Sequence, residues 1–180
     1  MSYLITCSGS KKTPTADLNG NFDDLFRHDL LGKHRQNLIG QSGISLDWNK
    51  TLPAYELYSG TRSKIYQKIG QNNWHKQDAD ILILSALFGW IRHTDLIPLY
   101  DLKMDQKKGK MQFPSFLFWR NLDVLPNLIN NQDFDLLSKN YKKALNNKGI
   151  ISAVIPNGFS YSDRGDCVGY WLENELNNQK

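Results

Sequence analysis

The chain has 180 residues, which is enough for one domain that buries its own hydrophobic core. Apolar residues make up 40% and charged residues 22%, a composition typical of globular proteins that excludes a disordered chain. The net charge of +4 and a pI near 9.0 lean weakly toward polyanionic partners such as nucleic acid, although many basic enzymes never bind it.

Cysteine content and hydropathy indicate the compartment. Cys7 and Cys167 are too few for a disulfide framework, which favours a reducing cytoplasm. No signal peptide is recognisable, and the longest aliphatic run, residues 81–84, is far too short to span a membrane. Neither the cysteines nor the four histidines show metal-ligand spacing, so we predict a cytoplasmic protein without metal, cofactor or membrane partner.

The first half of the chain predicts two buried strands. Residues 3–7 read as a short strand that ends in a polar run, and residues 13–48 lack clean periodicity, with at most a short helix over 23–31. A helix is predicted from about residue 61 to 69. Residues 80–85 form the strongest predicted strand, because a run that is apolar on both pleats is typical of a central strand covered on both faces.

After this strand, residues 87–100 are expected to form an aromatic-rich loop, and residues 101–110 a solvated charged segment. Residues 115–130 have a helical pattern that Pro126 should kink or split.

The last part of the chain predicts a helix over residues 134–147, capped by Asp133 and closed by Gly149. A third strand is expected over 150–155 and a final helix over about 167–177. Strands that alternate with helices predict an α/β fold, here one domain over the whole chain with a mostly parallel central sheet flanked by helices.

Two polar loops follow the buried strands, at the place where open parallel sheets bind ligands. The first comprises Cys7, Ser8, Gly9, Ser10, Lys11 and Lys12. Small residues let backbone N–H groups approach an anion, while the two hydroxyls and two lysines add donors and charge, so the loop is a candidate phosphate contact. It lacks Walker spacing, and the alternative is a flexible surface loop with incidental lysines.

The second loop runs from residue 85 to 101 and contains stacking, charged and titratable groups. Its candidate ligand contacts are Ser85, Phe88, Gly89, Trp90, Arg92 and Tyr100, its candidate catalytic carboxylates are Asp95 and Asp101, and His93 can titrate near neutral pH. A base stacked on an aromatic ring gains about 1–3 kcal/mol. The alternative is that the aromatic rings belong to the core and that Arg92 pairs with Asp95. Tyr58, before the Ser59-Gly60 turn, is a further candidate contact for a base or sugar.

The residues from Leu84 to Arg92, followed by Asp95 and the stretch from Pro98 to Met104, resemble the signature of the YaaA peroxide-stress family. The Tyr58-Ser59-Gly60 turn, the Ser8–Lys12 region and Trp119 are similar to further family features. The resemblance implies a compact α/β fold, a cytoplasmic role, DNA binding and protection from oxidative damage.

The chain departs from this family at three points. Asp101 and Lys103 stand where the family has Arg and Glu, the family's basic C-terminal extension has no counterpart, and the opening residues are closer to short relatives of unknown function. The opening is also faintly similar to a uracil-DNA-glycosylase-like domain of archaeal tRNA-modifying enzymes. That similarity implies a pocket for a flipped base, beside which Asp101 adds a carboxylate.

Three functions follow as hypotheses. The first is a DNA N-glycosylase that excises a modified or damaged base, with Asp95 or Asp101 orienting water, the aromatic rings stacking on the base, and Lys11, Lys12 and Arg92 holding phosphates. The second is a non-catalytic DNA-binding stress protein of the YaaA type. The third is an enzyme that processes a nucleoside or nucleotide, which the modest net charge favours.

Overall fold

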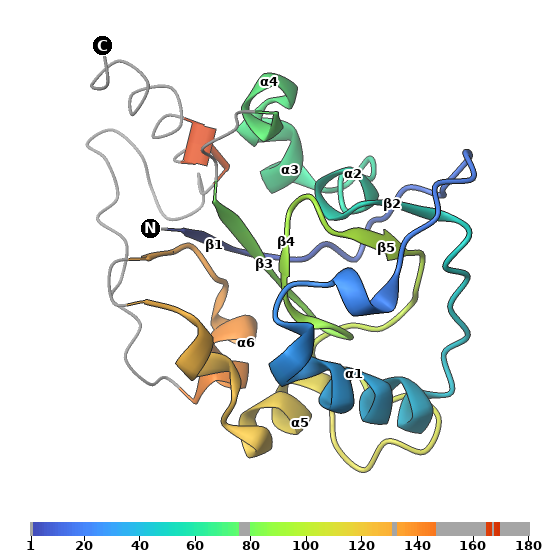
Figure 1. Cartoon of the computed structure of the whole chain (residues 1–180). Coiled ribbons are helices and arrows are strands. Elements are labelled where there is room, and N and C mark those ends of the chain that lie inside the picture. Colours follow the sequence, from blue (N-terminus) through green and yellow to red (C-terminus); the bar gives the residue numbers. More distant parts are fainter. Residues whose placement is uncertain (1, 76–79, 131–132, 147–164, 167, 170–180) are drawn as a thin grey trace.

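The computed structural model describes residues 2–75, 80–130, 133–146, 165–166 and 168–169. Its centre is a four-stranded sheet with the order β4-β3-β1-β6 (Figure 1). The strands are β1 (Tyr3–Thr6), β3 (Ile81–Ser85), β4 (Gly89–Arg92) and β6 (Phe134–Asp135). β1 is parallel to both β3 and β6, and only β4 runs antiparallel, so the predicted mostly parallel α/β sheet is confirmed.

The two predicted buried strands form the middle of this sheet. Every residue of β1 and β3 is buried, and Leu4 lies opposite Leu82 in the register. The ladder continues one residue past β1, where the Cys7 amide donates to the Leu84 carbonyl at 3.1 Å. The segments that follow β1 and β3 therefore leave the sheet from the same edge, side by side.

The segment 87–100, expected to be a loop, contains two strands, so that prediction was wrong. A tight turn after β3 leads directly into β4, and strands joined by so short a connection can pair only antiparallel. Gly89 begins β4 with a φ of 65°, and a Cβ there would lie 3.1 Å from both Trp119 and Leu125 side-chain atoms. The second strand, β5 (Leu96–Pro98), pairs with β2 (Thr51–Pro53) in a separate two-stranded sheet.

The longest helix, α1 (His28–Ser42), was not predicted, although it begins inside the short helix expected over 23–31. It follows the short 3-10 turn η1 (Phe22–Asp24). Its buried residues include Gly32, Arg35 and Ser42 as well as Leu31 and Leu38, so its buried side carries too few apolar residues to produce a hydrophobic period.

Shorter helices surround the sheets: α2 (Ala54–Leu57), α3 (Lys64–Ile69) and α4 (Gln71–Trp74). α3 confirms most of the helix predicted from residue 61. In Figure 1 these three lie on the opposite side of the central sheet from α1. No helix in the described part of the chain combines the length and apolar character needed to cross a membrane.

The helix predicted over 115–130 is split, as Pro126 suggested. α5 (Ser115–Leu122) ends where Asp123 adopts a left-handed φ of 51°, and the 3-10 turn η2 (Leu125–Leu128) contains the proline. The Trp119 indole N–H donates to the Ala86 carbonyl at 3.0 Å and thereby fixes α5 to the turn after β3.

The continuous helix predicted over 134–147 was wrong. Its first residues form β6, because the Phe134 and Leu136 amides complete the ladder beside β1. Only α6 (Lys139–Lys142) and the 3-10 turn η3 (Lys143–Leu145) are helical. Asp133 does not cap a helix, since its carboxylate accepts from the Ser2 amide at 2.7 Å. The strand predicted over 150–155, Gly149 and most of the final predicted helix lie outside the described residues.

Arg35 joins α1 to the β3–β4 hairpin. Its side chain is fully buried and donates to three backbone carbonyls, those of Phe88 at 2.8 Å and of Phe26 and Trp90 at 2.7 Å. Burial lowers the pKa of Arg35 to about 10, an effect that the charge of Asp95 partly offsets, so the guanidinium stays charged at neutral pH.

We expect Arg35→Met to lower the free energy of unfolding by about 3 kcal/mol, because two buried carbonyls and one partly buried carbonyl lose their donor at a cost of roughly 1–3 kcal/mol for each buried group. Urea unfolding followed by circular dichroism measures the change. Lys33→Met, at an exposed position of the same helix, is the matched control and should cost little. Equal stability of the two variants would contradict the role given to Arg35.

Candidate functional site

The loop of residues 7–12 does not lie free on the surface. The Ser8 and Ser63 hydroxyls are hydrogen-bonded, and the Ser63 hydroxyl also donates to the Ser10 carbonyl at 2.9 Å. The Lys12 amide donates to the Leu57 carbonyl at 2.8 Å. Gly60 allows the loop to approach this closely, because a Cβ at residue 60 would lie 2.7 Å from the Ser10 backbone. Two of the predicted segments, 7–12 and 58–60, are thus held together, and both loop serines already have partners within the protein.

A chain of buried hydroxyl groups connects these segments to the end of β3. The Ser85 hydroxyl accepts from the Leu87 and Phe88 amides at 3.3 and 3.1 Å, which uses both of its lone pairs. Its own hydrogen is therefore directed to the Tyr100 hydroxyl, 2.8 Å away, and Tyr100 in turn donates to Tyr58 at 2.7 Å. Burial raises the pKa of both tyrosines well above the ordinary value, so both phenols are neutral.

The two tyrosine rings form a floor for Lys11. Its ammonium lies 4.5 Å from the centroid of the Tyr100 ring and 5.8 Å from that of Tyr58. Such a position is stabilised by cation–π attraction. Among the described residues no carboxylate lies within ion-pair distance of Lys11, and the structure gives its ammonium no hydrogen bond. The charge is thus held by aromatic faces and is available to a ligand.

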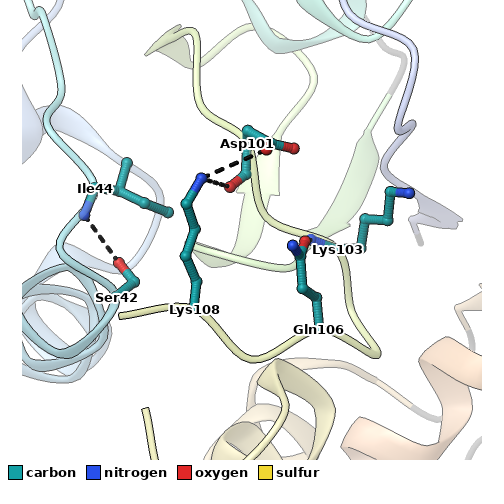
Figure 2. Close-up of polar contacts among 6 residues, drawn as sticks. All are labelled: Ser42, Ile44, Asp101, Lys103, Gln106 and Lys108. Carbon is teal, nitrogen blue, oxygen red and sulfur yellow. Dashed lines mark hydrogen bonds and ion pairs between the residues drawn. The ribbon is translucent and has the colours of Figure 1, made fainter. Parts of the chain in front are cut away.

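Lys11 lies in a pocket of about 510 Å³, which we call the lysine pocket. Its lining combines the first loop, the end of α1 and the segment after β5: Gly9, Lys11, Gly43, Ile44, Ser45, Leu99, Tyr100, Asp101 and Lys108. Figure 2 shows Lys108 extending to Asp101, while at the end of α1 the Ser42 hydroxyl accepts from the Ile44 amide. The Lys108 ammonium donates to the Asp101 carbonyl at 2.9 Å and lies 3.4 Å from its carboxylate.

The neighbouring lysine faces a different place. Lys12 lines a second pocket, of about 340 Å³, together with Tyr55, Tyr66, Trp74 and polar residues of α2 to α4. The Trp74 ring stacks between Tyr55 and Tyr66, with centroid distances of 5.4 and 5.5 Å. The two lysines that the sequence suggested as one phosphate contact are therefore separated.

The two candidate carboxylates do not share a cavity. Asp101 lines the lysine pocket, whereas Asp95 lines a third one, of about 230 Å³, next to Asn19 and Thr94. The Asp95 carboxylate accepts from the Phe26 amide at 2.9 Å and the Arg92 amide at 3.0 Å. Burial raises the pKa of Asp95, although these hydrogen bonds and the charges of Arg35 and Arg92 oppose the effect. Asp95 fixes the turn between β4 and β5.

The other residues of the second loop are mostly parts of the core. Phe88 and Trp90 are fully buried, and the Trp90 indole donates to the Leu125 carbonyl at 3.1 Å, so neither ring offers an open stacking face. Gly89 begins β4 and provides the positive φ in the turn of the β3–β4 hairpin. The exposed Arg92 guanidinium lies 5.1 Å from the centroid of the Phe26 ring, and Arg92 meets Asp95 through its backbone amide.

Sequence reasoning missed two parts of the pocket. Residues 43–45 follow α1, whose polar buried side concealed the helix, although Gly43 is the kind of residue that ends one. Lys108 lies in a segment that reads as solvated charge, with four lysines and two aspartates over residues 101–110. Buried Leu102 and Met104 anchor that segment, and they were its detectable sign of order.

The environment of Lys11 weakens its hold on a proton. Burial lowers the pKa of Lys11, and nearby Lys103 lowers it further, while Cys7 and Asp101 raise it. A larger fraction of the amine is therefore neutral near pH 8 than for a solvent-exposed lysine, and the neutral amine is the nucleophilic form.

We expect Lys11 to titrate below the ordinary lysine value, with opposite shifts in two variants. Asp101→Asn removes a charge that favours the ammonium, so the Lys11 pKa should fall further, whereas Lys103→Met should raise it. Reductive ¹³C-methylation followed by NMR titration measures each pKa, and a Lys11→Arg sample assigns the signal. Movement of the signal in the same direction in both variants would contradict this electrostatic account.

A known protein family matches most of the chain. A family model described as peroxide stress protein YaaA matches residues 30–172, which is more than half of the chain. The match includes the second loop and Lys108 and begins after Lys11. No curated protein matches the chain. The extent of the family match shows that the chain belongs to the YaaA family of peroxide stress proteins.

Proposed function

We propose that this protein acts in the cytoplasmic response to peroxide stress by binding DNA, and that the lysine pocket receives the sugar and phosphate of one nucleotide. The observation that carries the proposal is that Lys11 and Lys108 enter one open pocket from separate segments, while Lys11 has no carboxylate partner among the described residues. Lysine side chains that neutralise phosphates release counterions, which supplies essentially all of the affinity for DNA in binding that is not sequence-specific.

The size and walls of the pocket support this assignment. Its volume of about 510 Å³ falls within the range of roughly 300–1,000 Å³ typical of ligand sites. Gly9 and Gly43 are exposed at its rim and have open space where a Cβ would stand, so a backbone can approach closely. Lys103, Lys107 and Lys110 continue the positive charge along the segment that carries Lys108.

The arrangement of carboxylates favours binding over base excision. The excision hypothesis needs a carboxylate that orients water at the reacting sugar. Asp95 instead holds backbone amides in another part of the molecule, and Asp101 is engaged by Lys108. Phe88 and Trp90, which the excision hypothesis uses for stacking, are fully buried.

We expect the protein to shift duplex DNA with a strongly salt-dependent affinity. Lys11→Met and Lys108→Met should each weaken binding and reduce the slope of log K against log[salt] by about 0.9, the value for one lost phosphate contact. Fluorescence anisotropy at several salt concentrations measures both quantities. Lys64→Met, on α3 and outside the lysine pocket, is the control and should leave the slope unchanged. Equal slopes for all variants would place the DNA elsewhere.

The same protein and duplexes distinguish DNA binding from excision of a base. Plain duplexes and duplexes with modified bases should stay intact when they are incubated with the protein and then heated in alkali. Strand breaks that disappear in Asp101→Asn would instead establish excision of a base. Absence of any DNA shift, together with thermal stabilisation by a free nucleotide, would establish a small-molecule site.

A further inference from the structure

We propose that the Lys11 amine forms an imine with the aldehyde of an abasic site in DNA, so that the lysine pocket captures this lesion covalently and reversibly. The inference rests on the proposed binding of DNA at this pocket. It assigns to Lys11 a role as a nucleophile, which a phosphate contact alone does not require.

The geometry around Lys11 suits a nucleophile better than a structural cation. A structural lysine is usually paired with a carboxylate, as Lys142 is with Asp135 at 2.7 Å. Lys11 lies instead over two neutral phenol rings at the side of an open pocket. Its partial burial lowers the pKa, so more of the amine is unprotonated near neutral pH than is usual for lysine.

The pocket also contains the other groups that the step needs. An abasic sugar has lost its base, so it needs space for a sugar and a phosphate but no aromatic stacking partner, and the lysine pocket offers none that is open, since Tyr100 is buried beneath Lys11. Lys108 supplies a second positive charge for the flanking phosphate.

The step balances without any further reactant. The Lys11 nitrogen attacks the aldehyde carbon, a C–N bond forms, and the carbonyl oxygen becomes the hydroxyl of a carbinolamine after proton transfer. Loss of this hydroxyl together with the one hydrogen that remains on the nitrogen releases water and gives the imine, so both hydrogens of that water come from the amine. No atom is oxidised or reduced, and hydrolysis returns the amine and the aldehyde.

The test is covalent trapping of the full-length protein on a duplex with one abasic site, in the presence of sodium cyanoborohydride. We expect a protein–DNA adduct on a denaturing gel, with the modification mapped to Lys11 by mass spectrometry. Lys11→Arg keeps the positive charge but removes the nucleophile, so trapping should fall at least tenfold. Lys12→Arg is the matched control, because the neighbouring lysine faces another pocket, and it should trap like the unaltered protein.

A second duplex identifies the source of any failure. A duplex with a tetrahydrofuran analogue has no aldehyde, so it should bind in a native gel but leave no adduct. Binding of this duplex without trapping on the true abasic site would overturn the imine proposal and leave DNA binding intact. Failure to bind either duplex would overturn both proposals.

Two other outcomes would also overturn the imine proposal. Trapping that persists in Lys11→Arg would assign the chemistry to another amine. Trapping of free deoxyribose 5-phosphate but not of the duplex would make a small aldehyde the ligand.

Discussion

The hydrogen-bonded chain from Ser85 through Tyr100 to Tyr58 is the interaction on which the site depends. It joins the end of the central strand to two segments that are distant in sequence, and all three hydroxyls are buried. Removal of any member would leave a buried polar group without its partner, at a cost of about 1–3 kcal/mol. The same rings support Lys11, so the stability of this floor and the position of the amine cannot be varied separately.

The two carboxylates that looked equivalent in sequence show how environment divides one residue type between two roles. Asp95 accepts from the Phe26 amide, and the Phe26 carbonyl accepts from Arg35, so Asp95 belongs to the network that fastens α1 to the hairpin. Asp101 is largely exposed and is held at the pocket wall by Lys108. Substituting Asp95 therefore changes the scaffold first, whereas substituting Asp101 acts on the charge felt by Lys11.

The central parallel strands and the meeting of their two following loops could be predicted, because unbroken aliphatic runs are local signals and parallel strands end at one edge. Lys11 and Tyr100 can therefore be identified from the sequence as candidates for one site. The helix α1 could not be predicted, because Arg35 stands on its buried side at a position where an apolar residue would be expected. The separation of Lys11 from Lys12 was equally hidden, because it depends on contacts with residues 57–63.

Burial of Lys11 has opposite consequences for its two proposed uses. Burial removes water from the Lys11 ammonium and disfavours its charged form. This is a disadvantage for a residue that only neutralises phosphate. The exposed lysines of the segment 101–110 supply such charge without that penalty. A half-buried amine over neutral rings is useful where the unprotonated form must be populated and still be positioned. The position of Lys11 over two neutral rings at the side of an open pocket therefore supports the proposed role as a nucleophile in addition to that of a phosphate contact.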